Sequence, residues 1–303
     1  MKIGMIGLGK MGANMALRLR RQGFQVVGYD HSPATLERLE QEAGIIAAQS
    51  PGELVAALPA PRIIWLMLPS GPVTSKQIEE LVALLSAGDV VVDGGNSNYH
   101  DSKHHGALLA GAGIGFMDAG TSGGVWGLEN GYCLMVGGTP AVVSTVTPVL
   151  KALAPDPERG WAHVGPIGAG HFVKMIHNGI EYGMMQSLAE GLSLLRNKPE
   201  FALDLASITE LWRHGSVIRS WLLDLTAQAL QGDQQLESIA PFVADSGEGR
   251  WTAIEAIAQG TPAPVLTLAL YQRFQSQDMQ GYGLKLLSLM RNAFGGHAMK
   301  GTP

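Results

Sequence analysis

The feature that most constrains the fold is a glycine pattern between two short apolar segments near the start of the chain. Residues 2–7 predict a strand, which runs into Gly7-Leu-Gly-Lys-Met-Gly12. A helix is predicted over 13–21, and a second strand over 25–29 ends at Asp30. Strand, G-x-G-x-x-G, helix, strand and acidic residue, in that order, are the fingerprint of a dinucleotide-binding βαβ unit.

Each position of this fingerprint has a physical reason. Gly7 permits the tight turn, Gly9 lets the backbone approach a pyrophosphate, and Gly12 lets the helix pack closely on the strand. The N-terminus of the helix offers N–H donors and a positive potential to the phosphates. Asp30 is expected to accept hydrogen bonds from the ribose hydroxyls of the cofactor.

Strands and helices continue to alternate up to residue 164, as in a parallel sheet covered by helices. The predicted strands cover 62–68, 89–92, 115–118, 132–136 and 161–164, and the predicted helices 73–85, 99–110 and 140–153. Loops rich in Gly, Ser and Asn follow three of these strands, at 69–72, 93–97 and 119–125. Ligands of such sheets bind beyond the carboxyl ends of the strands, so we expect a binding crevice there. The candidate cofactor-binding residues are Gly7, Leu8, Gly9, Met11, Gly12, Asp30, Leu68, Pro69, Ser70 and Asn96.

The alternation stops near Gly168, and the rest of the chain has helical periodicity. The predicted helices cover 168–195, 203–214, 220–229, 251–259, 265–279 and 283–293. The expected fold is therefore an α/β Rossmann-type N-terminal domain, residues 1–166, followed by an all-α C-terminal domain, residues 167–303, for substrate binding and oligomerisation.

The long helix predicted from Gly168 carries four polar residues at i, i+3, i+4 and i+7: Lys174, His177, Asn178 and Glu181. This spacing places them on one helical face. The other positions, Phe172, Val173, Met175, Ile176 and Ile180, are apolar, so we expect the helix to pack on that side and the polar face to line a site. Gly170, Gly179 and Gly183 cost helix stability, which indicates close approach by a ligand or another backbone.

Composition excludes several classes of function. The 303 residues carry a net charge of −5, which argues against nucleic acid and anionic membranes as partners. No apolar run reaches the length of a membrane span, and no secretory cleavage pattern follows Met1. The single Cys133 excludes an internal disulfide and fits a reducing compartment, so we expect a cytoplasmic protein. No metal site is expected, and the pair His104-His105 is interpreted as solvated surface.

With these features the chain resembles the decarboxylating 6-phosphogluconate dehydrogenases over nearly its whole length. The resemblance lies in Gly168-Ala-Gly-His-Phe-Val-Lys-Met-Ile-His-Asn-Gly-Ile-Glu-Tyr182, whose Lys-x-x-His-Asn-x-x-Glu-Tyr run is highly specific. It extends to Asp93-Gly-Gly-Asn-Ser97, Thr121-Ser-Gly-Gly124 and Gly249-Arg-Trp-Thr252. The family's Arg and Gly-Gly-His positions match Arg291 and Gly295-Gly-His297.

The resemblance implies a role for each matching residue. Lys174 would be the general base and Glu181 the acid that protonates the enediol. The residues that would hold the sugar acid are Asn96, Ser122, Gly123, Gly124, His177 and Asn178. Those implied for its phosphate end are Tyr182, Arg250, Thr252 and Arg273, with Arg291 and His297 reaching the site from a neighbouring subunit.

Two departures from the family's long members refine this expectation. This chain has one set of helices where the long members have about two, so a homodimer or homotetramer with shared active sites is implied. Asp30-His-Ser32 stands where the long members commonly have Asn-Arg-Thr for the 2′-phosphate of NADP. A carboxylate would repel that phosphate, so NAD is the expected cofactor.

Two other functions remain open from the residues. One is an NAD-dependent β-hydroxyacid dehydrogenase of the 3-hydroxyisobutyrate type, which acts on an unphosphorylated acid and shares the Ser-Gly-Gly loop and the lysine. The other is a non-catalytic NAD-sensing or scaffold protein, which would tolerate loss of Lys174 and Glu181.

Overall fold

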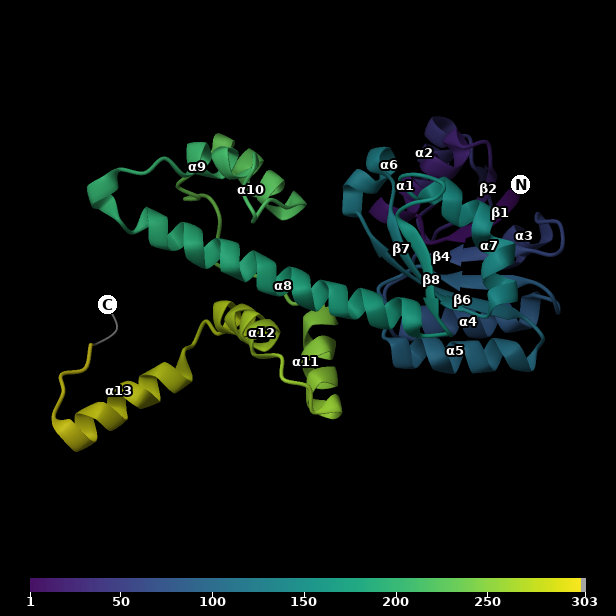
Figure 1. Cartoon of the computed structure of the whole chain (residues 1–303). Coiled ribbons are helices and arrows are strands. Elements are labelled where there is room, and N and C mark those ends of the chain that lie inside the picture. The colour runs from purple at the N-terminus through teal and green to yellow at the C-terminus, as the bar shows by residue number, and fades with distance from the viewer. Residues whose placement is uncertain (301–303) are drawn as a thin grey trace. The chain divides into compact units, whose positions relative to one another are not determined.

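The computed structural model describes residues 1–300 and divides into two compact units, one from Met1 to Asn178 and one from Gly179 onward (Figure 1). The first unit is an eight-stranded sheet with helices. Its strands are β1 (Lys2–Ile6), β2 (Gln25–Tyr29), β3 (Ile46–Ala47), β4 (Ile63–Leu66), β5 (Val90–Asp93), β6 (Gly115–Ser122), β7 (Cys133–Gly138) and β8 (Trp161–Gly165). Its helices are α1 (Lys10–Arg21), α2 (Pro33–Ala43), α3 (Pro51–Ala56), α4 (Pro72–Leu84), α5 (Tyr99–Gly111), η1 (Gly124–Trp126), α6 (Gly127–Asn130) and α7 (Pro140–Leu153).

The sheet has the strand order β3-β2-β1-β4-β5-β6-β7-β8. All neighbouring strands are parallel except β6 and β7. The order reverses between β1 and β4, which creates a switch point where the loops after these strands diverge. The Rossmann-type first part of the predicted fold is therefore confirmed.

Helices cover both faces of the sheet because successive strand residues point to opposite sides. On β1, Ile3 and Met5 belong to a core with α1, α2 and α7. Ile6 belongs to a second core with α3, α4 and α5. The central strands β1, β2, β4 and β5 are buried on both sides and are mostly apolar, as parallel strands usually are, whereas β8 is largely exposed.

The segment between β2 and β4 contains α2, β3 and α3, which the sequence analysis left unassigned. Both helices have a clear start signal: Ser32 and Ser50 are N-caps whose hydroxyls accept a backbone N–H, and Pro33 and Pro51 follow at the first helical position. These short helices lacked a long apolar period, so their caps were the better signal.

The strand β6 is longer than predicted. Residues 119–122 were expected in a loop, but they pair in register with β7, from Ala119 with Val136 to Ser122 with Cys133. The connection between the two strands holds only η1 and α6, too little for the helical crossover that a parallel pair requires. An antiparallel pair results, and it carries the Ser-Gly-Gly loop at its end.

The expectation that His105 is solvated surface is wrong. Its side chain is buried in α5, and Ser75 Oγ of α4 lies 3.0 Å from its Nε2. Burial lowers the pKa of His105, which favours the neutral ring. His104 is exposed, as predicted, because adjacent helical residues point in different directions.

The second unit is helical. Its elements are η2 (Pro199–Phe201), α9 (Leu205–Trp212), α10 (Trp221–Gly232), α11 (Glu248–Gln259), α12 (Pro264–Gln277) and α13 (Tyr282–Gly295), and the long α8 (Ala169–Arg196) begins in the first unit and ends here. Each predicted helix is present, with ends shifted by a few residues. The all-α second part of the predicted fold is thus confirmed.

The second unit has a small core formed by Tyr182, Ala253, Ala269 and Leu270. Many of its large apolar side chains are exposed, among them Leu211, Ile257 and Leu284. Within residues 1–300, no helix combines the length and the apolar character needed to cross a membrane.

Candidate active site

The turn after β1 has the geometry that its glycines predict. Gly7 has φ of +89°, which disfavours any other residue, and its N–H donates to the carbonyl of Tyr29. A Cβ on Gly12 would lie 2.0 Å from the carbonyl oxygen of Gly7, so only glycine allows α1 to start this close to β1.

Asp30 ties the end of β2 to this turn. Its Oδ2 accepts the N–H of Leu8 at 2.7 Å, and its Oδ1 accepts the N–H of Ser32 at 2.9 Å. His31 Nδ1 lies 3.3 Å from the same carboxylate on an exposed ring. The carboxylate was expected to serve ribose hydroxyls; it also orders the glycine turn, and each oxygen retains a second acceptor position.

The loops after β1, β4 and β5 meet at the switch point. A Cβ on Gly7 would lie 2.5 Å from the carbonyl of Met67, and one on Gly95 would lie 2.6 Å from the carbonyl of Leu68. Asn96 follows Gly95 and is exposed. The predicted cofactor residues on these loops are therefore neighbours in the first unit.

This crevice fits a dinucleotide. Gly9 is the N-cap of α1 and no side chain caps that helix, so its first N–H groups face the opening. A Cβ on Gly9 would meet nothing within 4 Å, which leaves room for a diphosphate at the helix N-terminus.

Lys174 is the centre of the second part of the site in the first unit. It is 7% exposed, and Asn178, one turn further along α8, is 8% exposed. Lys174 Nζ donates to Asn178 Oδ1 at 2.5 Å and lies 3.5 Å from His177 Nδ1. His177 Nδ1 lies 3.1 Å from the same Asn178 oxygen. The structure thus brings these three predicted residues together.

The strand β6 forms the wall behind Lys174. A Cβ on Gly120 would lie 2.3 Å from Lys174 Cβ, so the strand and α8 are in direct contact. Two residues further on, Ser122 leads into Gly123, with φ of +134°, and Gly124, with φ of +53°. Both conformations favour glycine, which explains the Ser-Gly-Gly sequence of a loop that starts so near the lysine.

The glycines of α8 mark close packing against protein. A Cβ on Gly170 would lie 2.4 Å from the carbonyl of Met135, and one on Gly179 would lie 2.6 Å from Thr252 Cγ2. Close approach by a ligand or by another backbone was expected at these glycines, and Gly170 is approached by backbone. Gly179 instead makes room for a side chain.

The expectation that the apolar side of α8 is packed holds only in part. Met175 is buried, but Val173 and Ile180 are 37% and 50% exposed.

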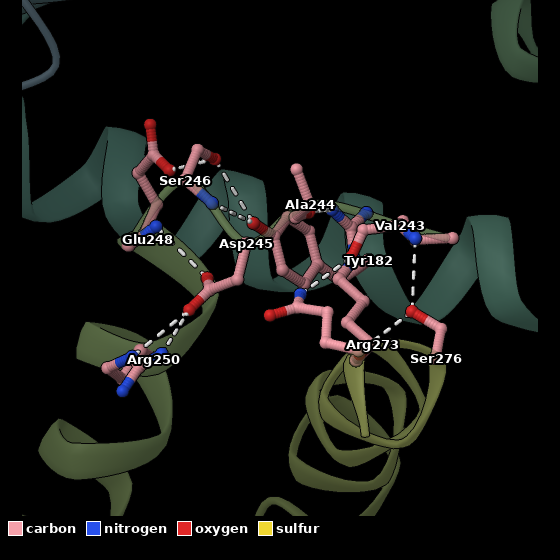
Figure 2. Close-up of polar contacts among 11 residues, drawn as sticks. Tyr182, Val243, Ala244, Asp245, Ser246, Glu248, Arg250, Arg273 and Ser276 are labelled. Atoms are coloured by element: carbon pink, nitrogen blue, oxygen red, sulfur yellow. Dashed lines mark hydrogen bonds and ion pairs between the residues drawn. The ribbon is translucent and has the colours of Figure 1, made fainter. Parts of the chain in front are cut away.

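In the second unit, the predicted phosphate-end residue Arg273 lies against Tyr182, while Arg250 lies further along beside Asp245 (Figure 2). The ring of Tyr182 is buried, and the Arg273 guanidinium carbon lies 3.4 Å from its centroid. Arg273 Nη1 also donates to the carbonyl of Ala244. The Tyr182 hydroxyl lies 3.2 Å from Ser246 Oγ, which donates in turn to Glu248.

Arg250 and Thr252 stand on α11 beside this group. Arg250 donates from Nε and Nη2 to one oxygen of Asp245, at 3.0 and 2.7 Å, and stacks on Phe274. Thr252 is buried and its hydroxyl donates to the carbonyl of Glu248. Glu181 is half-buried on α8, one residue before Tyr182.

The last two predicted residues lie outside this group. Arg291 is exposed on α13, and His297 is exposed beyond its end, where Asn292 Nδ2 donates to the His297 carbonyl. Large apolar side chains of α13 are exposed, among them Leu284 and Leu287. Among the described residues 1–300, no three or more His, Cys, Asp or Glu side chains lie together as possible ligands of a metal ion.

Two acidic residues of the site were missed by sequence reasoning. Asp245 pairs with Arg250, and its position five residues earlier, in a loop before a helix, gave a weak signal. Asp118 is fully buried near the start of α8, and an acidic residue at the end of an apolar strand was the available sign.

A Rossmann sheet with an open glycine turn, followed by a helix that carries a buried lysine, defines a dinucleotide-binding dehydrogenase with a separate helical domain. Residues 2–165 match the family profile described as the NAD-binding domain of 6-phosphogluconate dehydrogenase, and residues 170–281 match its C-terminal domain. The chain belongs to the 6-phosphogluconate dehydrogenase family.

Individual relatives agree with this assignment. A putative 6-phosphogluconate dehydrogenase of Bacillus subtilis is 41% identical, with 98% of this chain and 99% of the relative covered. An NAD(+)-dependent, decarboxylating 6-phosphogluconate dehydrogenase of Haloferax volcanii is 39% identical, with 98% of each covered. The solved 6-phosphogluconate dehydrogenase of Plasmodium falciparum is 27% identical, with a TM-score of 0.84. The match covers 100% of this chain and 67% of the Plasmodium falciparum chain.

Proposed function

We propose that this protein is an NAD-dependent, decarboxylating 6-phosphogluconate dehydrogenase. It oxidises 6-phospho-D-gluconate at C3 and releases carbon dioxide and ribulose 5-phosphate. The observation that carries the proposal is the buried Lys174, hydrogen-bonded to Asn178 and next to His177, in a chain that is similar over its whole length to an NAD(+)-dependent, decarboxylating relative.

Lys174 is the general base of the oxidation. Its neutral amine takes the proton of the substrate's 3-hydroxyl as the C3 hydrogen leaves as hydride. Bound NAD supplies the acceptor for that hydride. Asn178 and His177 hold the lysine in place, and Asn178 fixes the amino group with a hydrogen bond to Nζ.

The oxidised intermediate is a β-keto acid, which loses carbon dioxide from C1 because the C3 ketone accepts the electron pair. Lys174, protonated by the first step, donates to that ketone oxygen and stabilises the charge that develops there. Glu181 then protonates the enediol at the carbon that was C2 of the substrate. This carbon becomes C1 of the product. The Ser122-Gly-Gly124 loop and Asn96 hold the sugar acid.

Tyr182, Arg250, Thr252 and Arg273 bind the substrate phosphate. A guanidinium group suits a phosphate because its N–H groups match the oxygens in pairs. Stacking on Tyr182 keeps Arg273 in a fixed orientation, and Asp245 does the same for Arg250. The remaining two residues, Arg291 and His297, come from a second subunit.

A homodimer, or a homotetramer of such dimers, is the form that fits the second unit. Exposed leucines and methionines on α13, with Leu284 66% and Leu287 54% exposed, form an apolar surface that a single chain leaves in water. A second copy of the chain covers such surfaces in an isologous dimer. The single thiol, Cys133, fits a reducing compartment, and we assign the enzyme to the cytoplasm.

The experiment is an NADH absorbance assay with 6-phosphogluconate, gluconate and 3-hydroxyisobutyrate, combined with detection of carbon dioxide. We expect NADH and carbon dioxide in equal amounts from 6-phosphogluconate alone. Oxidation of 3-hydroxyisobutyrate with no reaction of 6-phosphogluconate would replace this proposal with a β-hydroxyacid dehydrogenase. No turnover of any of them, with NAD still bound, would favour a non-catalytic NAD-binding protein.

A further inference from the structure

Asp118 on β6 is a fully buried carboxylate to which the reaction described above gives no role. Its Oδ1 accepts the N–H of Gly168 at 2.7 Å, and its Oδ2 accepts the N–H of His171 at 2.8 Å. Gly168 directly precedes α8, and His171 lies in the first turn of that helix. Both carboxylate oxygens therefore bind the N-terminus of the helix that carries Lys174.

These contacts satisfy backbone N–H groups at the start of α8. The first N–H groups of a helix have no partner within it, and buried ones must find an acceptor elsewhere. A carboxylate is the best acceptor at this end, because its charge also complements the positive end of the helix dipole. Asp118 thus holds the first turn of α8 through two hydrogen bonds at once.

Glycines on both sides bring the helix onto this carboxylate. A Cβ on Gly170 would lie 2.6 Å from the Asp118 carbonyl, and one on Gly137 would lie 2.5 Å from Asp118 Oδ1. Two residues along β6, Gly120 contacts Lys174 Cβ. The same strand therefore fixes both the start of the helix and the base of the lysine side chain.

The charge of Asp118 is not explained by an ion pair. Within residues 1–300 no lysine or arginine pairs with it, and burial raises its pKa. The same turn is also held by His171, whose Nδ1 lies 2.7 Å from Ser102 Oγ of α5, and the nearby His171 ring acts against the rise in the pKa of Asp118. A buried carboxyl that is costly to ionise is retained where its hydrogen bonds are needed.

We propose that Asp118 is a positioning residue for Lys174, which anchors the first turn of α8 to β6 and so fixes where the amino group meets the substrate hydroxyl. The inference rests on the proposed role of Lys174. Displacing a base by about 1 Å costs on the order of 100-fold in rate, so loss of the anchor has a kinetic consequence that is separable from binding.

The test is Asp118→Asn, which keeps the size of the side chain but replaces one acceptor oxygen by an N–H donor facing a backbone N–H. Asp89→Asn is the matched control: Asp89 is also buried at a strand of the same sheet, but accepts its hydrogen bonds from Arg62 and Ser86, away from α8. Both are measured for kcat, KM, NAD affinity and circular dichroism, with Lys174→Met as the inactive reference.

We expect Asp118→Asn to be folded, to bind NAD as the wild type does, and to lose at least tenfold in kcat with little change in KM, while Asp89→Asn keeps its kcat. A kcat of Asp118→Asn within twofold of wild type overturns the inference. If the wild type itself does not oxidise 6-phosphogluconate, the proposed function fails. That result is distinct from an Asp118→Asn variant that keeps the kcat of an active wild type.

Amide hydrogen exchange of the wild type gives a test that does not require a variant to fold. The Gly168 and His171 amides are expected to be protected as strongly as those of the central strands, because both donate to a buried carboxylate. Rapid exchange of these two amides would contradict the anchor, whatever the activity.

Discussion

Lys174 shows how a single residue acquires a function through its surroundings. A lysine is seldom buried unless its ammonium group is paired or hydrogen-bonded. Here Asn178 accepts from Nζ, and Gly120 supplies the space for the side chain to leave the helix. The side-chain amide of Asn178 neither gains nor loses a proton near neutral pH. It can therefore orient the amino group of Lys174 without competing for the substrate proton.

Replacing Lys174 with methionine removes the base but keeps the length and apolar stem of the side chain. We expect kcat to fall by about 10²–10⁴-fold, the usual contribution of a general base, with NAD affinity unchanged. Lys76→Met, at an exposed lysine of α4, is the control and should retain wild-type turnover. Near-normal kcat in Lys174→Met would show that another group takes the proton.

We propose that Asp30 sets the choice between NAD and NADP. Its carboxylate lies directly after β2, and His31 Nδ1 lies 3.3 Å from it on an exposed ring. We expect kcat/KM to be higher with NAD than with NADP. In Asp30→Ala the preference should narrow, because a repulsive charge is lost, while both values fall because the Leu8 N–H loses its acceptor. A wild-type preference for NADP would refute this role.

At the scale of the element, α8 combines glycines that are required by packing with one that is not. Gly179 and Gly191 both lie inside this helix and both belong to the second unit. A Cβ on Gly179 would lie 2.6 Å from Thr252 Cγ2, whereas one on Gly191 would meet nothing within 4 Å.

Alanine at these two positions should therefore have opposite effects. Gly191→Ala should raise the free energy of unfolding by about 0.5–1 kcal/mol, because alanine costs less entropy in a helix. Gly179→Ala should lower it by about 1–3 kcal/mol, because a buried β-branched side chain must move. Urea denaturation followed by helical circular dichroism measures both. Equal stabilisation by the two changes would mean that Thr252 yields without cost.

The elements differ in how well the sequence predicts them. β1, α1 and β2 were predicted because apolar periods, glycines and Asp30 agree within thirty residues. The helices α2 and α3 were missed although a serine N-cap followed by proline marks the start of each. The pairing of β6 with β7 was missed because it depends on the length of the connection, which contains no crossover helix.

The candidate site was predictable to a similar degree. Helical spacing alone placed Lys174, His177 and Asn178 together, because a helix fixes which residues share a face. The hydrogen bond from Gly168 to Asp118 joins residues 50 positions apart that no local pattern connects, and the Asp245–Arg250 pair had only a weak local signal. Contacts of this kind follow from how strands and helices pack, and they become visible only with the fold.

At the scale of the whole molecule, the two units differ in how completely a single chain covers them. The central strands of the first unit are buried on both faces of the sheet. In the second unit, large apolar side chains of α13 are exposed, among them Tyr282, Leu284 and Leu289. This chain covers 67% of the solved Plasmodium falciparum enzyme. We propose that a second copy of the chain covers the exposed apolar side chains of α13.

This arrangement predicts that each active site uses two chains, with Lys174 from one and Arg291 and His297 from the other. Lys174→Met and the double variant Arg291→Ala/His297→Ala should each be inactive. After mixing under conditions that exchange subunits, a mixed dimer contains one site with an intact lysine and an intact tail. For equal, random mixing we expect about a quarter of the wild-type activity to return.

Subunit exchange must be demonstrated independently, for example by native mass spectrometry of two chains that differ in mass. The unmixed variants, taken through the same procedure, show how much activity arises without exchange. If mixed dimers form and activity stays at that background, the C-terminal segment serves the chain to which it belongs. Recovery would mean instead that α13 and the residues after it act on a neighbour, which is why their apolar side chains are exposed in a single chain.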